Sequence, residues 1–284
     1  MILVITGPTG VGKTKLSIEL AKKYQAVIIN ADSMQVYKGL DIGTAKIKET
    51  EKENIVHELF DIKEVTDMYT VYDYQKDVRN LLKKYKDQNI ILVGGTGLYI
   101  KAALYDYRFQ EEIDIDLSKY SNEELFQMCN QKDPNHNIHI NNRKRLERFL
   151  KRDETNNKDE LLYDAIFVGL TTDREKLYEI INNRVDKMLE SGLIAEVKYF
   201  YERNVRSKAL LTGIGYKELY DYFDHKISLE DAIMLIKKNS RKYAKRQYTW
   251  FRNQMNINWF NVDFENFQNT VNQVINFIEE RENV

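Results

Sequence analysis

The 284-residue sequence contains a single cysteine, Cys129, and no long apolar run. One cysteine cannot form a disulfide within the chain, and it excludes a zinc site built from several cysteines. A reducing compartment is therefore expected. No stretch approaches the roughly 18 apolar residues that a membrane-spanning helix needs, and Met1 leads directly into an apolar strand instead of a signal peptide. We expect a cytoplasmic protein without a membrane partner, and no feature requires more than a monomer.

The sequence also lacks an excess of either charge. Its 43 lysines and arginines and 44 aspartates and glutamates give a formal net charge of −1. The protein as a whole therefore has no overall attraction for nucleic acid, and binding of a polyanion would require a local cluster of positive charge. Hydrophobic residues make up 43% of the chain, which is ordinary for a globular protein with a sizeable core. Internal repeats and low-complexity tracts are absent.

Short apolar runs alternate with helical patterns along the chain. Four runs have the length and composition of buried strands: residues 2–6, 26–30, 89–93 and 165–170. Helical spacing of apolar residues predicts helices over residues 15–24 and 75–86. Strands without alternation, separated by helices, indicate a parallel sheet that is covered on both faces. The predicted fold class is therefore α/β.

The part of the chain after the fourth strand reads as helical. Thr172, with Glu175 three residues later, has the spacing of a capping box, and Gly192 is a candidate helix stop. Ser228 is expected to begin a long helix that runs to about Gln254. A last helix is predicted to place these apolar residues on one face: Phe264, Phe267, Val271, Val274 and Ile278.

Residues 108–160 differ from the rest of the chain. They begin with an acidic stretch, contain no strong strand signal, and include a basic helical segment at residues 142–151. We interpret them as a small helical domain inserted into a catalytic core formed by residues 1–107 and 161–284. The expected architecture is a P-loop-type parallel sheet flanked by helices, with this helical insertion.

A phosphate-binding motif follows the first predicted strand. The pattern G-x-x-x-x-G-K-[ST] is filled by Gly7, Pro8, Thr9, Gly10, Val11, Gly12, Lys13 and Thr14. Its glycines let backbone N–H groups point at phosphate oxygens, and the following helix adds the positive end of its dipole. Lys13 supplies a positive charge, and the Thr14 hydroxyl is a candidate Mg²⁺ ligand. The motif predicts a diphosphate or triphosphate ligand but says little about the reaction.

Two further segments end strands at the same edge of the predicted sheet. Asp32 follows the second strand, and ligands of parallel sheets bind at the carboxyl ends of strands. Asp32 is therefore a candidate Mg²⁺ partner or a candidate general base, and capping of the next turn is the structural alternative. Gly94 and Gly95 follow the third strand and permit close approach of a ligand, although a tight turn explains them equally well.

These segments and others downstream, taken in order, resemble the tRNA dimethylallyltransferase family (tRNA isopentenyl transferases) of the bacterial type. Besides the phosphate-binding motif, the resemblance is carried by Asp32-Ser33-Met34-Gln35-Val36-Tyr37, Asp41-Ile42-Gly43-Thr44-Ala45-Lys46, Gly94-Gly95-Thr96-Gly97-Leu98-Tyr99, Asn141-Asn142-Arg143-Lys144-Arg145, Arg184-Val185-Asp186-Lys187-Met188-Leu189, Gly215-Tyr216-Lys217-Glu218 and Tyr243-Ala244-Lys245-Arg246-Gln247 with Thr249-Trp250-Phe251. They span residues 7 to about 251. The ordered set is specific, although each motif alone is ordinary.

The resemblance implies transfer of a dimethylallyl group from dimethylallyl diphosphate to N6 of an adenosine (position 37) in a tRNA anticodon loop, with Mg²⁺. It places the general base at Asp32 and a diphosphate-binding arginine at Arg184. Thr14 would be the metal ligand. The implied tRNA contacts are Asp32, Ser33, Met34, Gln35, Thr96, Lys144, Arg145, Leu146, Glu147 and Arg148. The chain departs from the family's pattern at Ile140, where proline is common, and at Lys217, where arginine is common, so a bidentate contact at Lys217 is in doubt.

Two basic clusters supply the local positive charge that the balanced composition requires. In the insertion, Arg145, Arg148 and Arg152 share a helix face, which suits contact with the RNA backbone or a solvated surface. In the long C-terminal helix, Arg241, Lys245 and Arg252 recur along one stripe beside Arg246. We predict tRNA contacts for Lys217, Arg241, Lys245 and Arg246, with a solvated face as the alternative.

Three other functions fit parts of this pattern. The phosphate-binding motif and Asp32 alone would indicate a kinase of a small metabolite or nucleotide. A prenyltransferase acting on free adenine nucleotides would share both features, and the basic insertion favours tRNA over such a substrate without deciding the matter. A non-catalytic RNA-binding protein would leave the motif and Asp32 unexplained.

Overall fold

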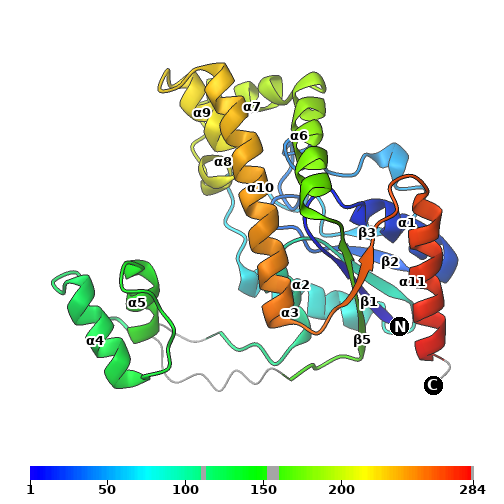
Figure 1. The fold of residues 1–284 in the computed structure, drawn as a ribbon, viewed down its shortest axis with the longest axis horizontal. Helices are drawn as coiled ribbons and strands as arrows, with labels where there is room; N and C mark the ends of the chain where they lie inside the picture. The colour runs from blue at the N-terminus through cyan, green and yellow to red at the C-terminus, as the bar shows by residue number, and fades with distance from the viewer. Residues whose placement is uncertain (110–112, 152–159, 283–284) are drawn as a thin grey trace. The chain divides into compact units, whose positions relative to one another are not determined.

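The computed structural model describes residues 1–109, 113–151 and 160–282 and divides into two units (Figure 1). The larger unit comprises Met1–Leu104 and Tyr163–Val284, and the smaller unit comprises Tyr105–Leu162. The boundaries predicted from the sequence differ from this division by a few residues. Within the described residues, none of the helices has the length and apolar character that crossing a bilayer requires.

A six-stranded parallel sheet forms the centre of the larger unit (Figure 1), with the strand order β3-β2-β4-β1-β5-β6. The strands are β1 (Ile2–Thr6), β2 (Val27–Asn30), β3 (His57–Glu58), β4 (Ile90–Val93), β5 (Ala165–Thr171) and β6 (Asn258–Asn261). The four central strands are those that the apolar runs predicted, and the α/β fold class is confirmed. The two edge strands were not predicted, because β3 has only two residues and β6 carries polar residues at both ends.

Helices cover both faces of this sheet. The helices of the larger unit are α1 (Lys13–Tyr24), α2 (Val71–Lys84), α3 (Gly97–Leu104), α6 (Arg174–Glu190), α7 (Leu193–Glu202), α8 (Lys208–Thr212), α9 (Tyr216–Phe223), α10 (Leu229–Gln254) and α11 (Phe267–Glu282), with a short 3₁₀ turn, η1 (Glu49–Glu51). Of these, α7, α8 and α9 pack against one another and against α6 and α10 (Figure 1). Leu16 of α1 and Val274 of α11 share one buried core with Ile5 and Val168 of the central strands. On β1, Leu3, Val4 and Ile5 alternate between the two faces of the sheet and are all fully buried, which explains why the central strands are continuously apolar.

Two details of the helices correct the sequence-based predictions. The N-cap of α6 is Asp173, whose carboxylate accepts a hydrogen bond from the Lys176 amide (2.8 Å), and not Thr172. Both residue types cap helices well, so the spacing from Thr172 to Glu175 was not decisive. Phe264 precedes α11 and is 39% exposed. The apolar face of α11 therefore begins at Phe267 and continues with Val271, Val274 and Ile278.

The smaller unit is a pair of helices with its own core. Helix α4 (Asn122–Lys132) begins with a capping box formed by Ser121 and Glu124, and helix α5 (Arg143–Leu150) follows it. The buried residues of this core are Leu117, Leu125, Cys129, Ile138 and Leu146. The thiol of Cys129 lies 3.6 Å from the carbonyl oxygen of Leu146 and is buried, so this cysteine packs the two helices together.

Candidate functional site

The phosphate-binding motif forms a loop between β1 and α1, as its spacing predicted. Gly7 has a φ of 135°, and a Cβ atom there would lie 2.4 Å from the carbonyl oxygen of Leu170, so only glycine fits. Lys13 folds back over the loop and donates hydrogen bonds to the carbonyl oxygens of Gly7 (3.0 Å) and Pro8 (2.7 Å). The loop thus has a defined shape with an ammonium group at its centre.

The charge of Lys13 is destabilised in this setting. The pKa of Lys13 is lowered to about 7, chiefly by burial and also by the nearby guanidinium of Arg184, while the carboxylate of Asp32 partly opposes both effects. Burial also lowers the pKa of Arg184. Two partly desolvated cations beside one carboxylate form a site that a polyanion would stabilise.

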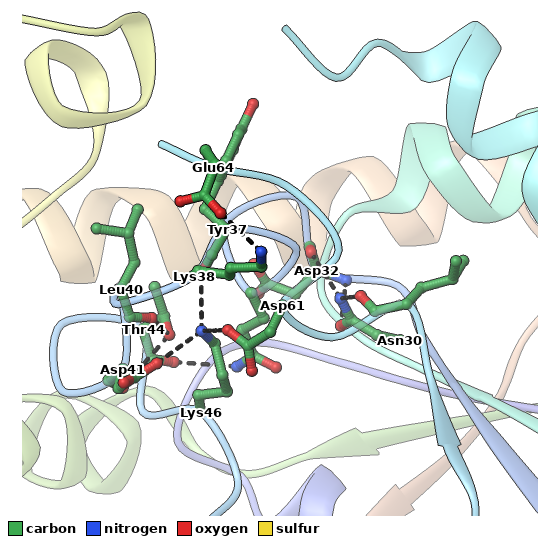
Figure 2. Close-up of polar contacts among 12 residues, drawn as sticks. Asn30, Asp32, Tyr37, Lys38, Leu40, Asp41, Thr44, Lys46, Asp61 and Glu64 are labelled. Atoms are coloured by element: carbon green, nitrogen blue, oxygen red, sulfur yellow. Dashed lines mark hydrogen bonds and ion pairs between the residues drawn. The ribbon is translucent and has the colours of Figure 1, made fainter. Parts of the chain in front are cut away.

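Asp32 is held at the end of β2 by its neighbours. Its amide donates to the side-chain oxygen of Asn30 (2.9 Å), and the Asn30 amide group donates to the carbonyl oxygens of Asp32 (3.1 Å) and Leu59 (3.0 Å), as Figure 2 shows in part. One carboxylate oxygen, Oδ1, accepts a hydrogen bond from the Met34 amide (2.9 Å). The turn-capping role is therefore present, but it occupies only one of the two carboxylate oxygens.

The loop after β4 lies against the loop after β2. The amide of Thr96 donates to the carbonyl oxygen of Ala31 (3.0 Å), and the Thr96 hydroxyl accepts from the amide of Ser33 (3.0 Å). A Cβ atom on Gly94 would lie 2.2 Å from the Ala31 carbonyl oxygen, so this glycine serves the close approach of two loops. Thr96 and Asp32 are thereby brought to one place, as the resemblance implied.

Tyr243 of α10 completes this corner of the site. Burial raises the pKa of its phenol, the charge of Asp32 acts in the same direction, and hydrogen bonding with Thr96 and Gln247 opposes them. The phenol therefore stays protonated and can donate a hydrogen bond beside Asp32. The sequence placed Tyr243 in a family motif but did not single it out as a site residue, since the chain has 19 tyrosines and no spacing distinguishes this one.

Gln247, also on α10, joins two loops of the site and was likewise not singled out. Its side-chain oxygen accepts from the amide of Thr9 (3.1 Å), and its side-chain nitrogen donates to the carbonyl oxygen of Gly95 (2.9 Å). The side chain is buried. A single amide group therefore holds the phosphate-binding loop and the loop after β4 at a fixed separation.

Arg184 enters the site from α6. Its guanidinium Nη2 donates to the carbonyl oxygen of Thr44 (3.2 Å), and the Gln35 side chain donates to the same oxygen (3.1 Å). The segment that carries Thr44 is anchored by Lys46, which donates to the carbonyl oxygen of Tyr37 (2.7 Å) and to the carboxylates of Asp41 (2.7 Å) and Asp61 (2.5 Å) (Figure 2). Arg184 is thus oriented by a loop from another part of the chain.

Two cavities meet at these residues. Thr9, Asp32, Thr44 and Arg184 line both of them. The first cavity is further lined by predicted site residues Ser33, Met34, Lys217 and Arg246, and by Tyr243. The second cavity is lined by Gly10, Gly12, Lys13, Thr14 and Gln35. Asp32 and Arg184 therefore lie where the two cavities meet. One cavity is lined by the phosphate-binding loop, and the other by Lys217, Tyr243 and Arg246.

The basic stripe expected on α10 is not a single surface. Arg241 is half-buried, and its guanidinium donates to the side-chain oxygen of Asn182 on α6 (2.5 Å). Its role is to join the two helices, which corrects the prediction that it shares an exposed stripe with Lys245. Lys245 and Arg246 are exposed, and only Arg246 lines the first cavity.

Helix α5 of the smaller unit presents its cations to solvent. Lys144, Arg145 and Arg148 are exposed, and together with Lys151 they line one shallow depression. Arg152 lies outside the described residues. The assignment of Leu146 to the RNA surface is wrong for its side chain, which is fully buried in the core of this unit.

Arg143 and Glu147, also on α5, make contacts within the smaller unit. The guanidinium of Arg143 donates to the carbonyl oxygens of Tyr120 (2.8 Å) and Leu117 (2.9 Å) and lies 2.7 Å from the Glu147 carboxylate. Arg143 therefore ties α5 to the segment before α4, and Glu147 supports it one helical turn later.

The surroundings of Thr14 suit a magnesium ion that is held mainly by the phosphates of a bound substrate. Thr14 is exposed at the start of α1 and lines the second cavity beside Lys13. Among the described residues there is no group of three or more histidine, cysteine, aspartate or glutamate side chains that would form a complete metal site. Mg²⁺ commonly binds through one or two protein oxygens, several waters and the phosphates of a substrate, so the hydroxyl of Thr14 suits this arrangement.

Comparison with known proteins adds independent information. The model of the protein family described as IPP transferase matches residues 35–254. The tRNA dimethylallyltransferase of Anoxybacillus flavithermus is 47% identical over 298 residues, covering 98% of this chain and 96% of the relative. That of Bacillus subtilis is 46% identical over 288 residues, covering 92% of this chain and 90% of the relative.

Solved structures agree with these matches. The tRNA isopentenylpyrophosphate transferase of Bacillus halodurans superposes with a TM-score of 0.77 at 39% identity, covering 98% of this chain and 95% of that one. A eukaryotic dimethylallyltransferase acting on tRNA superposes with a TM-score of 0.83 at 28% identity, covering 98% of this chain and 79% of that one.

Proposed function

The chain belongs to the IPP transferase family, and from this premise we propose that it is a tRNA dimethylallyltransferase that modifies N6 of an adenosine in the anticodon loop. Dimethylallyl diphosphate is the proposed donor, and tRNA is the proposed acceptor. The observation that carries this proposal is that Asp32 and Arg184 line both cavities. The adenine base of the tRNA in the first cavity and a diphosphate in the second would meet between these two side chains.

The chemistry of the acceptor requires a base at this point. The exocyclic amine of adenine is a poor nucleophile, because its lone pair is delocalised into the ring. As N6 bonds to C1 of the dimethylallyl group, the carbon–oxygen bond to the diphosphate breaks and N6 must lose a proton. Asp32 Oδ2 is the proposed acceptor of that proton, since Oδ1 is already held by the Met34 amide. Such general-base assistance is worth roughly 10²–10⁴-fold.

The leaving group requires positive charge. The diphosphate departs with an additional negative charge, and Lys13, Arg184 and the amides of the phosphate-binding loop are the proposed groups that stabilise it. Thr14 would hold Mg²⁺, which would neutralise part of the diphosphate charge. The lowered pKa of Lys13 supports this role, because a cation destabilised by burial gains most from an incoming anion.

The smaller unit is the proposed electrostatic contact for the tRNA backbone. Its exposed cations Lys144, Arg145 and Arg148 lie on one helix, and phosphate contacts of this kind position a nucleic acid without reading its sequence. The first cavity would then take the flipped adenosine, with Ser33, Met34, Thr96 and Lys217 as nearby residues.

The direct test offers the protein Mg²⁺, dimethylallyl diphosphate and unmodified tRNA, followed by digestion and mass spectrometry of the nucleosides. We expect an adenosine that has gained one dimethylallyl group, located in the anticodon loop by fragment mapping. Absence of the adduct, together with ATP-dependent phosphorylation of a metabolite, would identify a kinase instead. Modification of free AMP but not of tRNA would identify an adenine-nucleotide prenyltransferase.

A further inference from the structure

The carboxylate of Glu196, on α7, collects hydrogen bonds from four donors. Oε2 accepts from the amides of Asp41 (3.1 Å) and Ile42 (2.7 Å). Oε1 accepts from the amide of Gly43 (3.0 Å) and from the hydroxyl of Tyr216 (2.6 Å). Three consecutive backbone amides thus point at one carboxylate, a concave arrangement that suits an anion. Glu196 therefore fixes the backbone of residues 41–43.

The fixed segment ends at the residue that orients Arg184. The carbonyl oxygen of Thr44 directly follows the three amides and accepts from Arg184 Nη2 (3.2 Å). It is the one acceptor among the described residues for which a direct hydrogen bond from Arg184 is seen. A displacement of residues 41–43 would therefore move the guanidinium that lies between the two cavities.

We propose that Glu196 is a positioning residue for prenyl transfer, acting through the Thr44 carbonyl oxygen to hold Arg184 against the diphosphate. This inference rests on the proposed function, in which Arg184 stabilises the leaving diphosphate. Lys46 anchors the same segment through the Asp41 carboxylate and the Tyr37 carbonyl oxygen (Figure 2). The segment is thus held by an ammonium group and a carboxylate, and it presents the Thr44 carbonyl oxygen to Arg184.

Glu196→Gln tests the proposal with almost no change in volume. A glutamine has one acceptor oxygen, so its NH₂ group must face either the amides of Asp41 and Ile42 or the amide of Gly43, and donors would then face donors. We expect kcat/KM for dimethylallyl diphosphate and the affinity for inorganic pyrophosphate each to fall by about ten- to a hundredfold, since a group misplaced by about 1 Å can cost about 10²-fold in rate. The Kd for tRNA should stay within about twofold of the wild type.

The matched control is Glu202→Gln, which removes an exposed carboxylate from the same helix. We expect it to leave all three quantities unchanged. Tyr216→Phe removes one of the four hydrogen bonds and should give a smaller loss in the same two quantities; it replaces Glu196→Gln if that variant does not fold, as judged by its melting temperature.

A double-mutant cycle separates positioning from general stabilisation. In the Arg184→Ala background, Glu196→Gln should cause less than about a twofold further loss, because the group through which it acts is gone. A full, additive loss in that background would overturn the proposal, as would unchanged pyrophosphate affinity in folded Glu196→Gln. If wild-type protein binds pyrophosphate but transfers no prenyl group, the proposed function fails, and the pyrophosphate measurements still decide whether Glu196 acts through Arg184.

Discussion

The candidate site of the larger unit and helix α5 of the smaller unit use polar residues in opposite ways. In the site, the side chains of Gln247 and Arg184 are at least partly buried and bind backbone atoms far away in the chain, those of Thr9 and Thr44. On α5, Lys144, Arg145 and Arg148 are exposed to solvent. The difference follows from the task, because bond formation requires fixed geometry, whereas attraction to a phosphate backbone requires mainly charge density.

The comparison predicts how each region responds to substitution. Changes at Asp32 or Arg184 should alter kcat while leaving tRNA affinity intact, and changes to the exposed cations of α5 should alter tRNA affinity while leaving kcat intact. Only a substitution that unfolds one of these regions should affect its stability together with the activity or affinity that depends on it.

Asp32→Asn should reduce kcat by at least about a hundredfold, since the amide cannot accept the proton from N6. Asparagine keeps the side-chain oxygen that accepts from the Met34 amide, so the turn should persist. Pyrophosphate affinity, measured by calorimetry, should remain within severalfold of the wild type. Asp67→Asn is the control, because Asp67 also caps a turn, through the Glu64 amide, but is exposed away from the site. Normal transfer by Asp32→Asn would show that Asp32 is not the base.

Leu146→Ala should destabilise the smaller unit by about 2–5 kcal/mol while removing no charge. We expect faster amide hydrogen exchange in α4 and α5 and weaker tRNA binding, since the basic helix is no longer held in place. Leu162→Ala, at a position 47% exposed in the same unit, should change stability by less than about 0.5 kcal/mol. If Leu146→Ala unfolds the unit and tRNA still binds normally, the smaller unit is not the RNA surface.

Gln247→Ala should destabilise the larger unit by about 1–3 kcal/mol, because it leaves the Thr9 amide and the Gly95 carbonyl oxygen without their partner. The phosphate-binding loop should become more mobile, so we also expect weaker pyrophosphate binding. Gln254→Ala serves as the control, since Gln254 is exposed at the end of the same helix and its side-chain oxygen accepts a hydrogen bond from the exposed end of Lys101 (3.0 Å). Identical melting temperatures and pyrophosphate affinities for the two variants would contradict the bridging role of Gln247.

Much of the larger unit could be predicted from the sequence because its signals are local. The central strands are continuously apolar, and Gly7 to Thr14 form a contiguous motif, so neighbouring residues were sufficient. Of the edge strands, which have a neighbour on one side only, β3 has two residues and β6 carries asparagine at both ends, which leaves little apolar signal. Leu146 was misassigned because the family motif marks a segment as a whole, whereas its burial follows from which face of α5 meets α4.

The contacts that organise the site could not be predicted from local signals. Gln247, Glu196 and Arg184 bind backbone groups that are 140 or more residues away. Backbone amides and carbonyls are present at every residue, so the sequence around residues 9 or 43 contains no mark of its partner. The resemblance named Arg184 as a diphosphate ligand but contained nothing about the carbonyl oxygen that orients it.

The smallest effect is expected for single cations of α5, and it tests the comparison most directly. Lys144→Ala should weaken tRNA binding only severalfold and leave kcat at saturating tRNA unchanged. The variant should be distinguished by its salt dependence. Loss of one phosphate contact lowers the magnitude of the slope of log K for tRNA binding against log salt concentration by roughly 0.7–0.9. Arg145→Ala and Arg148→Ala should behave alike, and the three changes together should remove roughly 2–2.7 from the slope if each cation meets one phosphate.

Two variants with the same change in charge show whether the location matters. Lys176→Ala removes an exposed lysine from the larger unit, where it pairs with Glu179 (3.0 Å), and should leave the slope unchanged. Arg143→Ala removes a cation from α5 that is bound to the carbonyl oxygens of Tyr120 and Leu117, so it should lower the melting temperature as well as tRNA affinity. Because the chain is nearly neutral overall, equal slopes for Lys144→Ala and Lys176→Ala would mean that α5 has no special part in binding. A lower slope for Lys144→Ala alone would instead locate the attraction for tRNA on this helix.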